Sequence, residues 1–443
     1  MVISETGSSR IESINYPFLA TAFFALNALY FILVFGTFDN PSCCDATLYL
    51  QGGRRFFEQG LLFDNPYSGY RSVWNYGIAE MVRFVGEPFR WIAGLPQKAT
   101  VSYAVGATLL FAVTAMTLLL VLGKRKGFKE IFCAIYLNPI SFLYLLYPLQ
   151  ESQIVLFLGP AIVIVATSLI AEKWNQSIVL LWSFAVAAWM VKGSFLLVAL
   201  PVIGLAIYLV LRATGPKKWI STCIGVAVAL AIVAPQSYIA LAKYGSLYPY
   251  PDHALLEKQL GWGYTSWHYE TVYDLNLEGD VKWKGDFSNN NYPPIKDTEA
   301  YTFKILSNPI EGLSLWVGHI FSAFNFSHLK VYITEPVVKF SFFNVLAGAA
   351  LFLGFLTSVG IVTRGPYDPQ DYFIDAVMIG SASALPLLAV ETRFSLLPAL
   401  ALSYRAIQWF TEADKNERVA QDLSCAALFG LLFGFAMTLV DIA

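Results

Sequence analysis

The chain has 443 residues, of which 56% are hydrophobic, 16% aromatic and 14% charged. Soluble domains carry about 25% charged residues, so this chain has too few charges to cover a water-facing surface. Its net charge of −2 excludes the basic surface by which proteins bind nucleic acids. The composition predicts an all-α polytopic integral membrane protein, with residues 1–443 in one membrane domain.

Eleven apolar segments approach the length needed to cross a bilayer, whose core of about 30 Å takes roughly 20 apolar residues in a helix. They are residues 17–35, 100–122, 131–149, 154–171, 177–191, 195–211, 220–242, 340–362, 373–390, 394–410 and 423–440. The stretch from 177 to 211 is too long for one span. Because Lys192, Gly193 and Ser194 lie at its middle, we expect a tight hairpin there.

Basic residues in the short connections predict the orientation, since cytoplasmic loops carry an excess of Lys and Arg. The strongest cluster lies at residues 124–129, and two more lie at 212–218 and 415–418. Eleven spans put all three clusters on the same side as the N-terminus. We therefore expect a multi-pass protein of the cytoplasmic membrane with these loops in the cytoplasm.

This orientation leaves two long segments outside, residues 36–99 and 243–339, with the last helices in residues 340–443. Both segments are rich in Trp, Tyr and Pro, a composition usual at a membrane–water interface. Within them, residues 45–63 and 310–326 are predicted to be interfacial helices that lie along the membrane. If 310–326 crosses it instead, every later helix is inverted.

Five ionisable residues fall at the external ends of the predicted helices: Asp45, Glu151, Lys192, Glu391 and Arg393. Such groups are costly in a membrane and often mark functional sites. Simpler roles also fit them, because Asp45 can cap a helix, Lys192 can extend to the interface and Glu391 can pair with Arg393. Their position on one face favours a shared external site.

The first external segment places Asp45 ahead of an amphipathic helix that contains Tyr49, Arg54 and Arg55. This pattern resembles the opening loop of the GT-C glycosyltransferases, membrane enzymes that use polyprenyl-phosphate sugars and include protein O-mannosyltransferases and aminoarabinose transferases. The stretch from Glu391 to Pro398 is similar to an acid-x-Arg-aromatic segment late in such chains. Many relatives carry paired acids after the first helix, whereas here Cys44 and Ala46 flank Asp45.

The resemblance implies a transferase that moves a sugar from a polyprenyl-phosphate donor to a lipid, glycan or protein acceptor. Asp45 would be the general base, a role that typically contributes about 10²–10⁴-fold. Cations would stabilise the departing phosphate, and the candidates are Arg393, Lys192, Arg54 and Arg55. Glu151 would be a second acid and Glu391 would orient Arg393.

Aromatic and histidine side chains are further candidates for contacts with the sugar or the acceptor: Tyr49, Tyr264 and His268. Neither CxxC nor HExxH spacing occurs, so no metal site is predicted. No cofactor is required, and a divalent metal stays open without support. Membrane lipids are expected as surroundings.

Three other functions fit the same pattern less well. A surface-polysaccharide polymerase or ligase also joins lipid-linked sugars outside the membrane. A secondary transporter commonly shows internal repeats and a site at mid-depth, whereas this chain shows no repeat and gathers its polar groups at one face. A non-catalytic membrane scaffold would tolerate alanine at every one of the charged residues.

Overall fold

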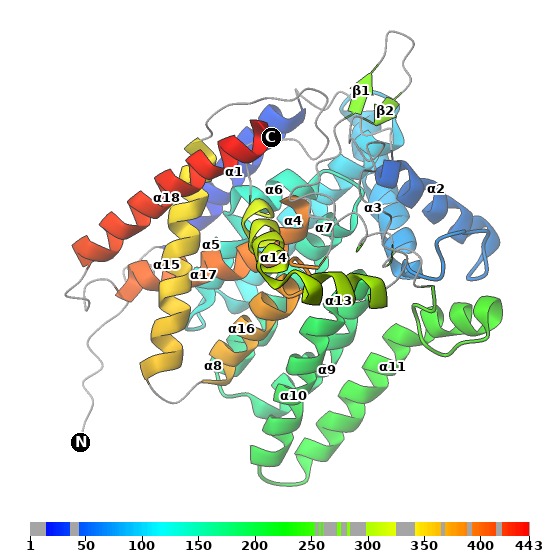
Figure 1. Cartoon of the computed structure of the whole chain (residues 1–443). Helices are drawn as coiled ribbons and strands as arrows, with labels where there is room; N and C mark the ends of the chain where they lie inside the picture. The colour runs from blue at the N-terminus through cyan, green and yellow to red at the C-terminus, as the bar shows by residue number, and fades with distance from the viewer. Residues whose placement is uncertain are drawn as a thin grey trace.

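The computed structural model describes residues 15–35, 44–252, 257, 260, 273–275, 281–283, 298–324, 342–364, 368–387, 392–412 and 419–442. This part of the chain is almost wholly helical (Figure 1). The exception is one antiparallel pair of short strands, β1 (Tyr273–Leu275) and β2 (Val281–Trp283). The predicted all-α class is confirmed at this level.

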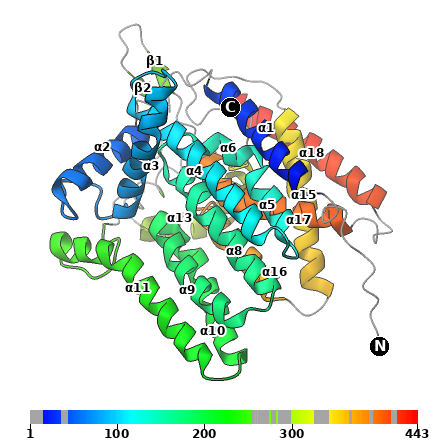
Figure 2. The same cartoon turned by 180° about the vertical axis from the view of Figure 1, so that it is seen from behind.

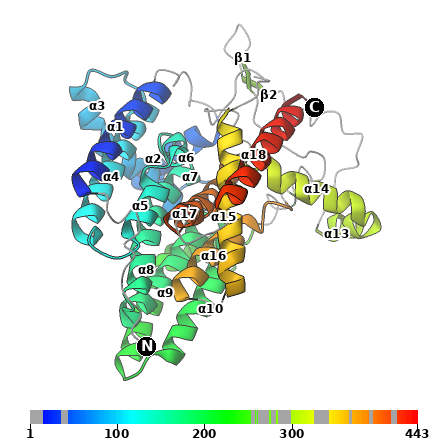
Figure 3. The ribbon, with the colours of Figure 1, turned by 90° about the vertical axis from the view of Figure 1, so that its left-hand side faces the viewer.

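The helices fall into two groups along the chain. The first group comprises α1 (Tyr16–Phe35), α2 (Cys44–Gln59), α3 (Val73–Ile92), α4 (Ala99–Leu122), α5 (Phe128–Tyr136), α6 (Pro139–Leu145), α7 (Gln150–Gln153), α8 (Gly159–Ile170), α9 (Trp174–Val191), α10 (Leu196–Arg212) and α11 (Lys217–Tyr244). The second comprises α13 (Thr298–Ser307), α14 (Pro309–Ser322), α15 (Phe342–Arg364), α16 (Pro369–Ala382), α17 (Leu396–Glu412) and α18 (Val419–Ile442). Helices α9, α10 and α11 run side by side (Figures 1 and 2), whereas α13 and α14 lie on the side away from α1 and α3 (Figure 3).

Seven helical segments within the described residues are long and apolar enough to cross a membrane: Ala99–Leu122, Gln150–Ile170, Trp174–Val191, Gly193–Arg212, Lys217–Tyr244, Asn344–Thr363 and Val419–Ala436. The bent pair α5 and α6 adds an eighth if it forms one span. These helices are consistent with a membrane protein. The predicted number of about eleven spans stays a prediction, since α16 and α17 have only 14 and 17 residues.

One predicted span differs from the helices observed, and one predicted hairpin is confirmed. The predicted span 131–149 is broken between α5 and α6, which meet at 48°. The first helix ends at Tyr136, whereas Asn138 caps the second and Pro139 begins it, because proline lacks an N–H and restricts the residue before it. The predicted hairpin at Lys192 is confirmed, with α9 ending at Val191.

The segment that leads into α8 contains a rare element. After the short helix α7, residues Ile154–Leu158 form a π-helical turn, η1, before α8 continues. Together they make one apolar segment, Gln150–Ile170. Single π turns inside α-helices are frequent at functional sites.

The basic connection 124–129 lies beside the start of α1 and the end of α8, and we call this end of the helices the basic end. The Tyr16 hydroxyl, at the start of α1, donates to the Gly123 carbonyl over 2.5 Å, and Lys129 Nζ lies 5.2 Å from the centre of the Tyr16 ring. A Cβ on Gly127 would lie 2.5 Å from Cδ1 of Ile170, so the end of α8 is there too. The predicted grouping of the start of α1 with residues 124–129 is thus found, although the structure assigns no side of a membrane.

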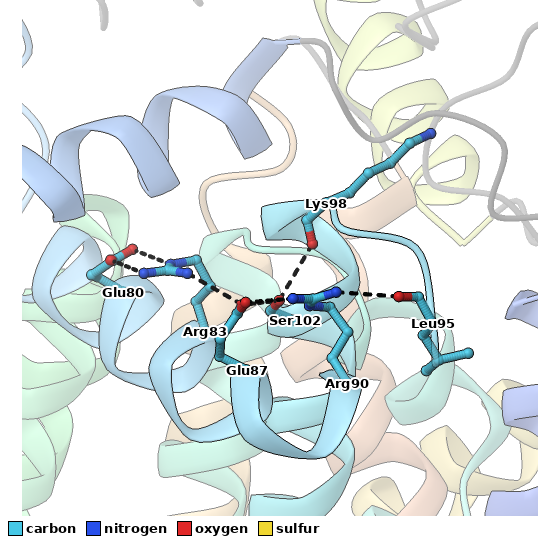
Figure 4. Close-up of polar contacts among 7 residues, drawn as sticks. All are labelled: Glu80, Arg83, Glu87, Arg90, Leu95, Lys98 and Ser102. Carbon is cyan, nitrogen blue, oxygen red and sulfur yellow. Dashed lines mark hydrogen bonds and ion pairs between the residues drawn. The ribbon is translucent and has the colours of Figure 1, made fainter. Parts of the chain in front are cut away.

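Helix α3 was not predicted, and it packs closely against α4. At its crossing with α4, Gly86 and Gly106 face each other, and a Cβ on Gly106 would lie 2.9 Å from the Gly86 nitrogen. Small residues permit such approach in membrane helices. Its four charges form a ladder, in which Arg83 bridges Glu80 and Glu87, and Arg90 contacts Glu87 over 2.6 Å (Figure 4).

Candidate functional site

Glu151 and Lys192, which are 41 residues apart, meet at the end of the helices opposite the basic end. Lys192 Nζ lies 3.5 Å from Glu151 Oε1, and the side chains are 15% and 3% exposed. The same Nζ lies 3.8 Å from the centre of the Phe394 ring. Phe394 belongs to the 3₁₀ turn η3 (Thr392–Ser395) at the start of α17. Three distant segments therefore converge on one ammonium group.

Local backbone geometry holds Lys192 at this position. The Lys192 backbone is extended (φ −147°, ψ 124°). It ends α9 and is followed by the 3₁₀ turn η2 (Gly193–Phe195). Its N–H still donates to Ala188, and its carbonyl accepts from Phe195. The break thus fixes the backbone while the long side chain turns toward Glu151 and Phe394.

Uncharged polar side chains join α3, α7 and α9 around this pair. Gln153 Nε2 donates to the Asn75 carbonyl over 2.9 Å, and Asn75 Nδ2 donates to the Val191 carbonyl over 3.1 Å. Ser152 bonds to the Tyr103 hydroxyl of α4. These side chains are buried, and within the described residues Asn75 Oδ1 and Gln153 Oε1 accept no hydrogen bond. The hydrogen bonds that the amide nitrogens donate attach the start of α3 directly beside Glu151 and Lys192.

The segment after α11 closes over the same junction. Gln236, buried on α11, accepts from the Val73 N–H and donates to the Ser68 and Pro249 carbonyls. The Tyr250 hydroxyl donates to the Trp189 carbonyl at 3.1 Å, and burial raises the pKa of this phenol. Its ring lies 3.8 Å from where a Cβ on Gly193 would stand.

Arg71, which the sequence reasoning missed, lies beside this junction on a platform of tyrosine rings. Its guanidinium carbon is 5.1 Å from the ring centres of Tyr49 and Tyr67 and 5.9 Å from that of Tyr70. These distances are in the range of cation–π attraction. The sequence signal was the run Tyr67-Ser68-Gly69-Tyr70-Arg71, which brings two aromatic residues close to a cation.

Three residues of α2 that were predicted to bind the sugar donor or the acceptor contact other side chains of the protein instead. Arg54 is 76% exposed and pairs with Glu58 one helical turn on. Arg55 is 49% exposed and contacts Asp64. Tyr49 is buried at 2% exposure and packs against Tyr76 and Arg71, so its ring faces are already covered in this conformation. The roles predicted for these residues remain predictions.

The remaining predicted residues lie partly or wholly outside the described residues. Asp45 is in the first turn of α2 and Arg393 is in η3, but their side chains are outside the described part. Glu391, Tyr264 and His268 lie outside it altogether. The structure thus joins Glu151, Lys192 and the turn that carries Arg393, and it leaves the rest of the predicted set untested.

A second charged cluster was also missed, between α16 and α17. Arg405 is fully buried and its Nη1 lies 2.5 Å from Asp371 Oδ1, while its Nη2 lies 2.9 Å from Asp375 Oδ1. Gln408 accepts a further bond from Arg405 over 2.8 Å. An arginine inside the predicted span 394–410 was a readable sign of this cluster, because charges within apolar segments are costly.

An apolar cavity of about 410 Å³ lies between α5, α6, α15 and α17. Its polar lining includes Asn138, at the break of α5 and α6, and Ser403, and the Asn138 amide donates to the Ser403 hydroxyl over 3.0 Å. The volume is within the about 300–1,000 Å³ of ligand pockets. Its polar groups satisfy each other, so it offers mainly apolar contacts.

Comparison with known proteins identifies no relative of this chain. No protein-family model, no curated protein and no solved structure gives a match. Among the residues that the structure describes, no group of three or more His, Cys, Asp or Glu side chains is placed to hold a metal ion.

Proposed function

We propose that the protein is a membrane glycosyltransferase of the GT-C type that moves a sugar from a polyprenyl-phosphate donor to a lipid, glycan or protein acceptor. The observation that carries the proposal is the meeting of Glu151, Lys192 and Phe394. It supplies a buried carboxylate, a cation and the turn that bears Arg393 in one place. The resemblance of the residues around Asp45 and Arg393 to that family supports the same reading.

The proposed step is a substitution at the anomeric carbon of the sugar. The acceptor hydroxyl oxygen forms the new bond to this carbon while the bond from the carbon to the phosphate oxygen breaks. The electron pair of that bond leaves with the polyprenyl phosphate. The hydroxyl proton passes to a carboxylate, for which we propose Asp45, and it is later released to water.

Charge accumulates on the phosphate as it departs, and fixed cations stabilise it best where water is excluded. Lys192 is a compact charge, whereas Arg393 offers two parallel hydrogen bonds. In the ground state Lys192 lies near Glu151. We propose that Glu151 holds Lys192 in position until the phosphate takes over part of that contact.

The position of Asp45 supports its inclusion through the packing of its helix. Helix α2 packs on α3, because Gly52 and Gly53 lie against Tyr76 and leave no room for a Cβ. The residue before Tyr76 is Asn75, which hydrogen-bonds with Gln153 and Val191. A rigid connection therefore runs from α2 to the residues next to Glu151 and Lys192.

The test uses purified full-length protein in lipid nanodiscs with a panel of polyprenyl-phosphate sugars and a mixed acceptor panel. Transfer by the wild type is expected, with a loss of about 10²-fold or more in Asp45→Asn, as for a general base. Glu151→Gln and Lys192→Met should also lower turnover. Lys218→Met, in the first turn of α11, is the matched control and should be unaffected. Equal turnover by wild type and Asp45→Asn would exclude Asp45 as the base.

A secondary transporter is the second candidate, favoured by one observation. The apolar cavity lies at the 48° break between α5 and α6, and transporters bind substrates beside discontinuous helices. Cysteines introduced at Leu143 and Ala399, which line the cavity, would be labelled from both sides in a transporter. If neither cysteine is labelled from the second side and the protein transfers sugar, the transferase proposal is supported.

A further inference from the structure

The lining of the cavity between α5, α6, α15 and α17 favours a hydrocarbon ligand. Its amide and hydroxyl side chains, Asn138 and Ser403, bond to each other over 3.0 Å, and the other lining side chains are apolar apart from the Cys133 thiol. A water molecule needs about two to four polar partners to be held in a cavity, so water is a poor occupant. An apolar cavity that nothing fills destabilises a protein in proportion to its volume, which is about 410 Å³ here.

The cavity is open at some of its lining residues and closed at others. Pro139, Leu346 and Phe410 are exposed, whereas Leu143 and Ala399 are buried at 4% and 2% exposure. The three exposed residues are all apolar, so they offer no hydrogen bond to a polar headgroup. A lipid that enters past them therefore inserts its hydrocarbon chain first.

The opening lies away from the candidate site. Leu346 belongs to α15, which provides one of the apolar segments long enough to cross a membrane, and most residues of that segment are exposed. Phe410 lies about 21 Å from the start of α17, at 1.5 Å per residue. Phe394, which contacts Lys192, precedes that start, and Ala399, the lining residue nearest to it along α17, is buried. The open part of the cavity thus faces the surroundings of α15 and not the candidate site.

We propose that this cavity binds one acyl chain of a membrane phospholipid, which enters past Leu346 and Phe410. The proposal goes beyond the proposed sugar transfer and does not depend on it. Lipid chains are as apolar as leucine side chains, and in a bilayer they surround the exposed face of α15. The bound chain fills the space beside the 48° break between α5 and α6 and stabilises this bent pair.

The test uses the full-length protein in nanodiscs that contain a phosphatidylglycerol with a photoreactive diazirine near the end of one acyl chain. After illumination, mass spectrometry of peptides should find lipid adducts on the buried lining residues Leu143 and Ala399. Ala350→Phe places a ring in the cavity and should lower these adducts about 10-fold, which corresponds to about 1.4 kcal/mol of binding free energy. Ala350→Leu fills less of the space and should lie between. Val113→Phe is the matched control, since Val113 is exposed on α4 and lines no part of the cavity, and its adducts should equal those of the wild type.

Two results with phosphatidylglycerol would overturn the proposal. One is labelling of exposed helix surfaces with no adduct on Leu143 or Ala399. The other is an equal yield of these adducts in Ala350→Phe and the wild type when both melt at the same temperature. If Ala350→Phe does not fold, Ala350→Leu is judged by the same comparison.

A polyprenyl phosphate that carries the same diazirine is the parallel probe. Adducts on Leu143 and Ala399 from this probe, with none from phosphatidylglycerol, would assign the cavity to an isoprenoid substrate and overturn the phospholipid proposal. Sugar transfer is measured separately on the same samples. Phospholipid adducts on the buried residues without sugar transfer would support the lipid site while the transferase proposal fails.

Discussion

Arg405, which is fully buried, and Lys192, which is partly buried, are both cations with carboxylate partners, but they are held in different ways. Arg405 makes five hydrogen bonds, to Asp371, Asp375 and Gln408, at 2.5–3.1 Å. These use all five donors of a guanidinium. Lys192 lies 3.5 Å from Glu151 and rests on the Phe394 ring. The first arrangement leaves no donor for a ligand, whereas the second can exchange its contact.

This difference indicates a structural role for the Arg405 cluster and a ligand-binding role for Lys192. The Arg405 cluster joins α16 to α17, and α17 carries η3 and Phe394 at its start. We therefore expect the cluster to position one wall of the site without contacting substrate. Mutations should separate the two roles by what they change, stability in one case and turnover in the other.

The largest effect on stability is expected for Arg405→Met. It leaves Asp371 and Asp375 buried without their counter-charge, which typically costs about 3–5 kcal/mol. Unfolding in mixed micelles, titrated with SDS, measures the free energy. A decrease of less than about 1 kcal/mol in the free energy of unfolding would mean that the cluster does not hold α16 and α17 together.

Gly106→Ala tests the α3–α4 crossing and should come next. The new methyl group would overlap the Val82 carbonyl of α3, and overpacking of this kind typically costs about 1–3 kcal/mol. Since α3 also carries Asn75 to the site, turnover should fall with stability. Gly204→Ala is the matched control, because nothing lies within 4 Å of its added Cβ. Equal melting of the two variants would contradict the close packing.

Lys192→Met should cost less stability than Arg405→Met, about 1–2 kcal/mol, because one carboxylate can neutralise itself by taking up a proton. Its sugar transfer should nevertheless be almost abolished. The same two assays, run side by side, measure both quantities. If Lys192→Met destabilises as much as Arg405→Met and keeps its turnover per folded molecule, the two clusters do not differ as argued.

The smallest effect concerns Glu87 in the ladder of α3. Hydrogen bonds from Arg90 and then Ser102 hold the pKa of Glu87 below its ordinary 4.5. Its contribution to stability is therefore complete above about pH 4.5 and is lost as the pH falls through the lower folded value. The side chain is 40% exposed, so solvent screening limits the contribution to under about 1 kcal/mol. The melting temperature of Glu87→Gln should therefore change less with pH, between pH 5 and 3, than the melting temperature of the wild type.

The sequence predicted most helices because the length of apolar runs is a strong signal. It missed α3 because Glu80, Arg83, Glu87 and Arg90 interrupt the apolar pattern. Those charges stand three or four residues apart, where they pair along a helix, and the ladder confirms such pairing. The bend at Pro139 was readable from the proline itself, although its angle depends on packing.

The site was predictable only through its charges. Glu151 and Lys192 stood out because ionisable groups at helix ends are few. Asn75, Gln153 and Gln236 were not predicted, since buried amides have no pattern in one sequence and their partners are backbone carbonyls. Arg71 was missed because one of the rings around it, Tyr49, belongs to helix α2, well before it in the chain.

The π turn η1 has a consequence for how Glu151 is aimed. A π turn holds one residue more than an α turn, and each residue of an α-helix turns the chain by about 100°. If the same five residues, Ile154–Leu158, formed regular α-helix instead, the additional residue would rotate Glu151 by about 100° around the helix axis, away from Lys192. The remainder of α8 would keep its packing. One inserted amino acid thus sets the direction of the carboxylate independently of the helix that supports it.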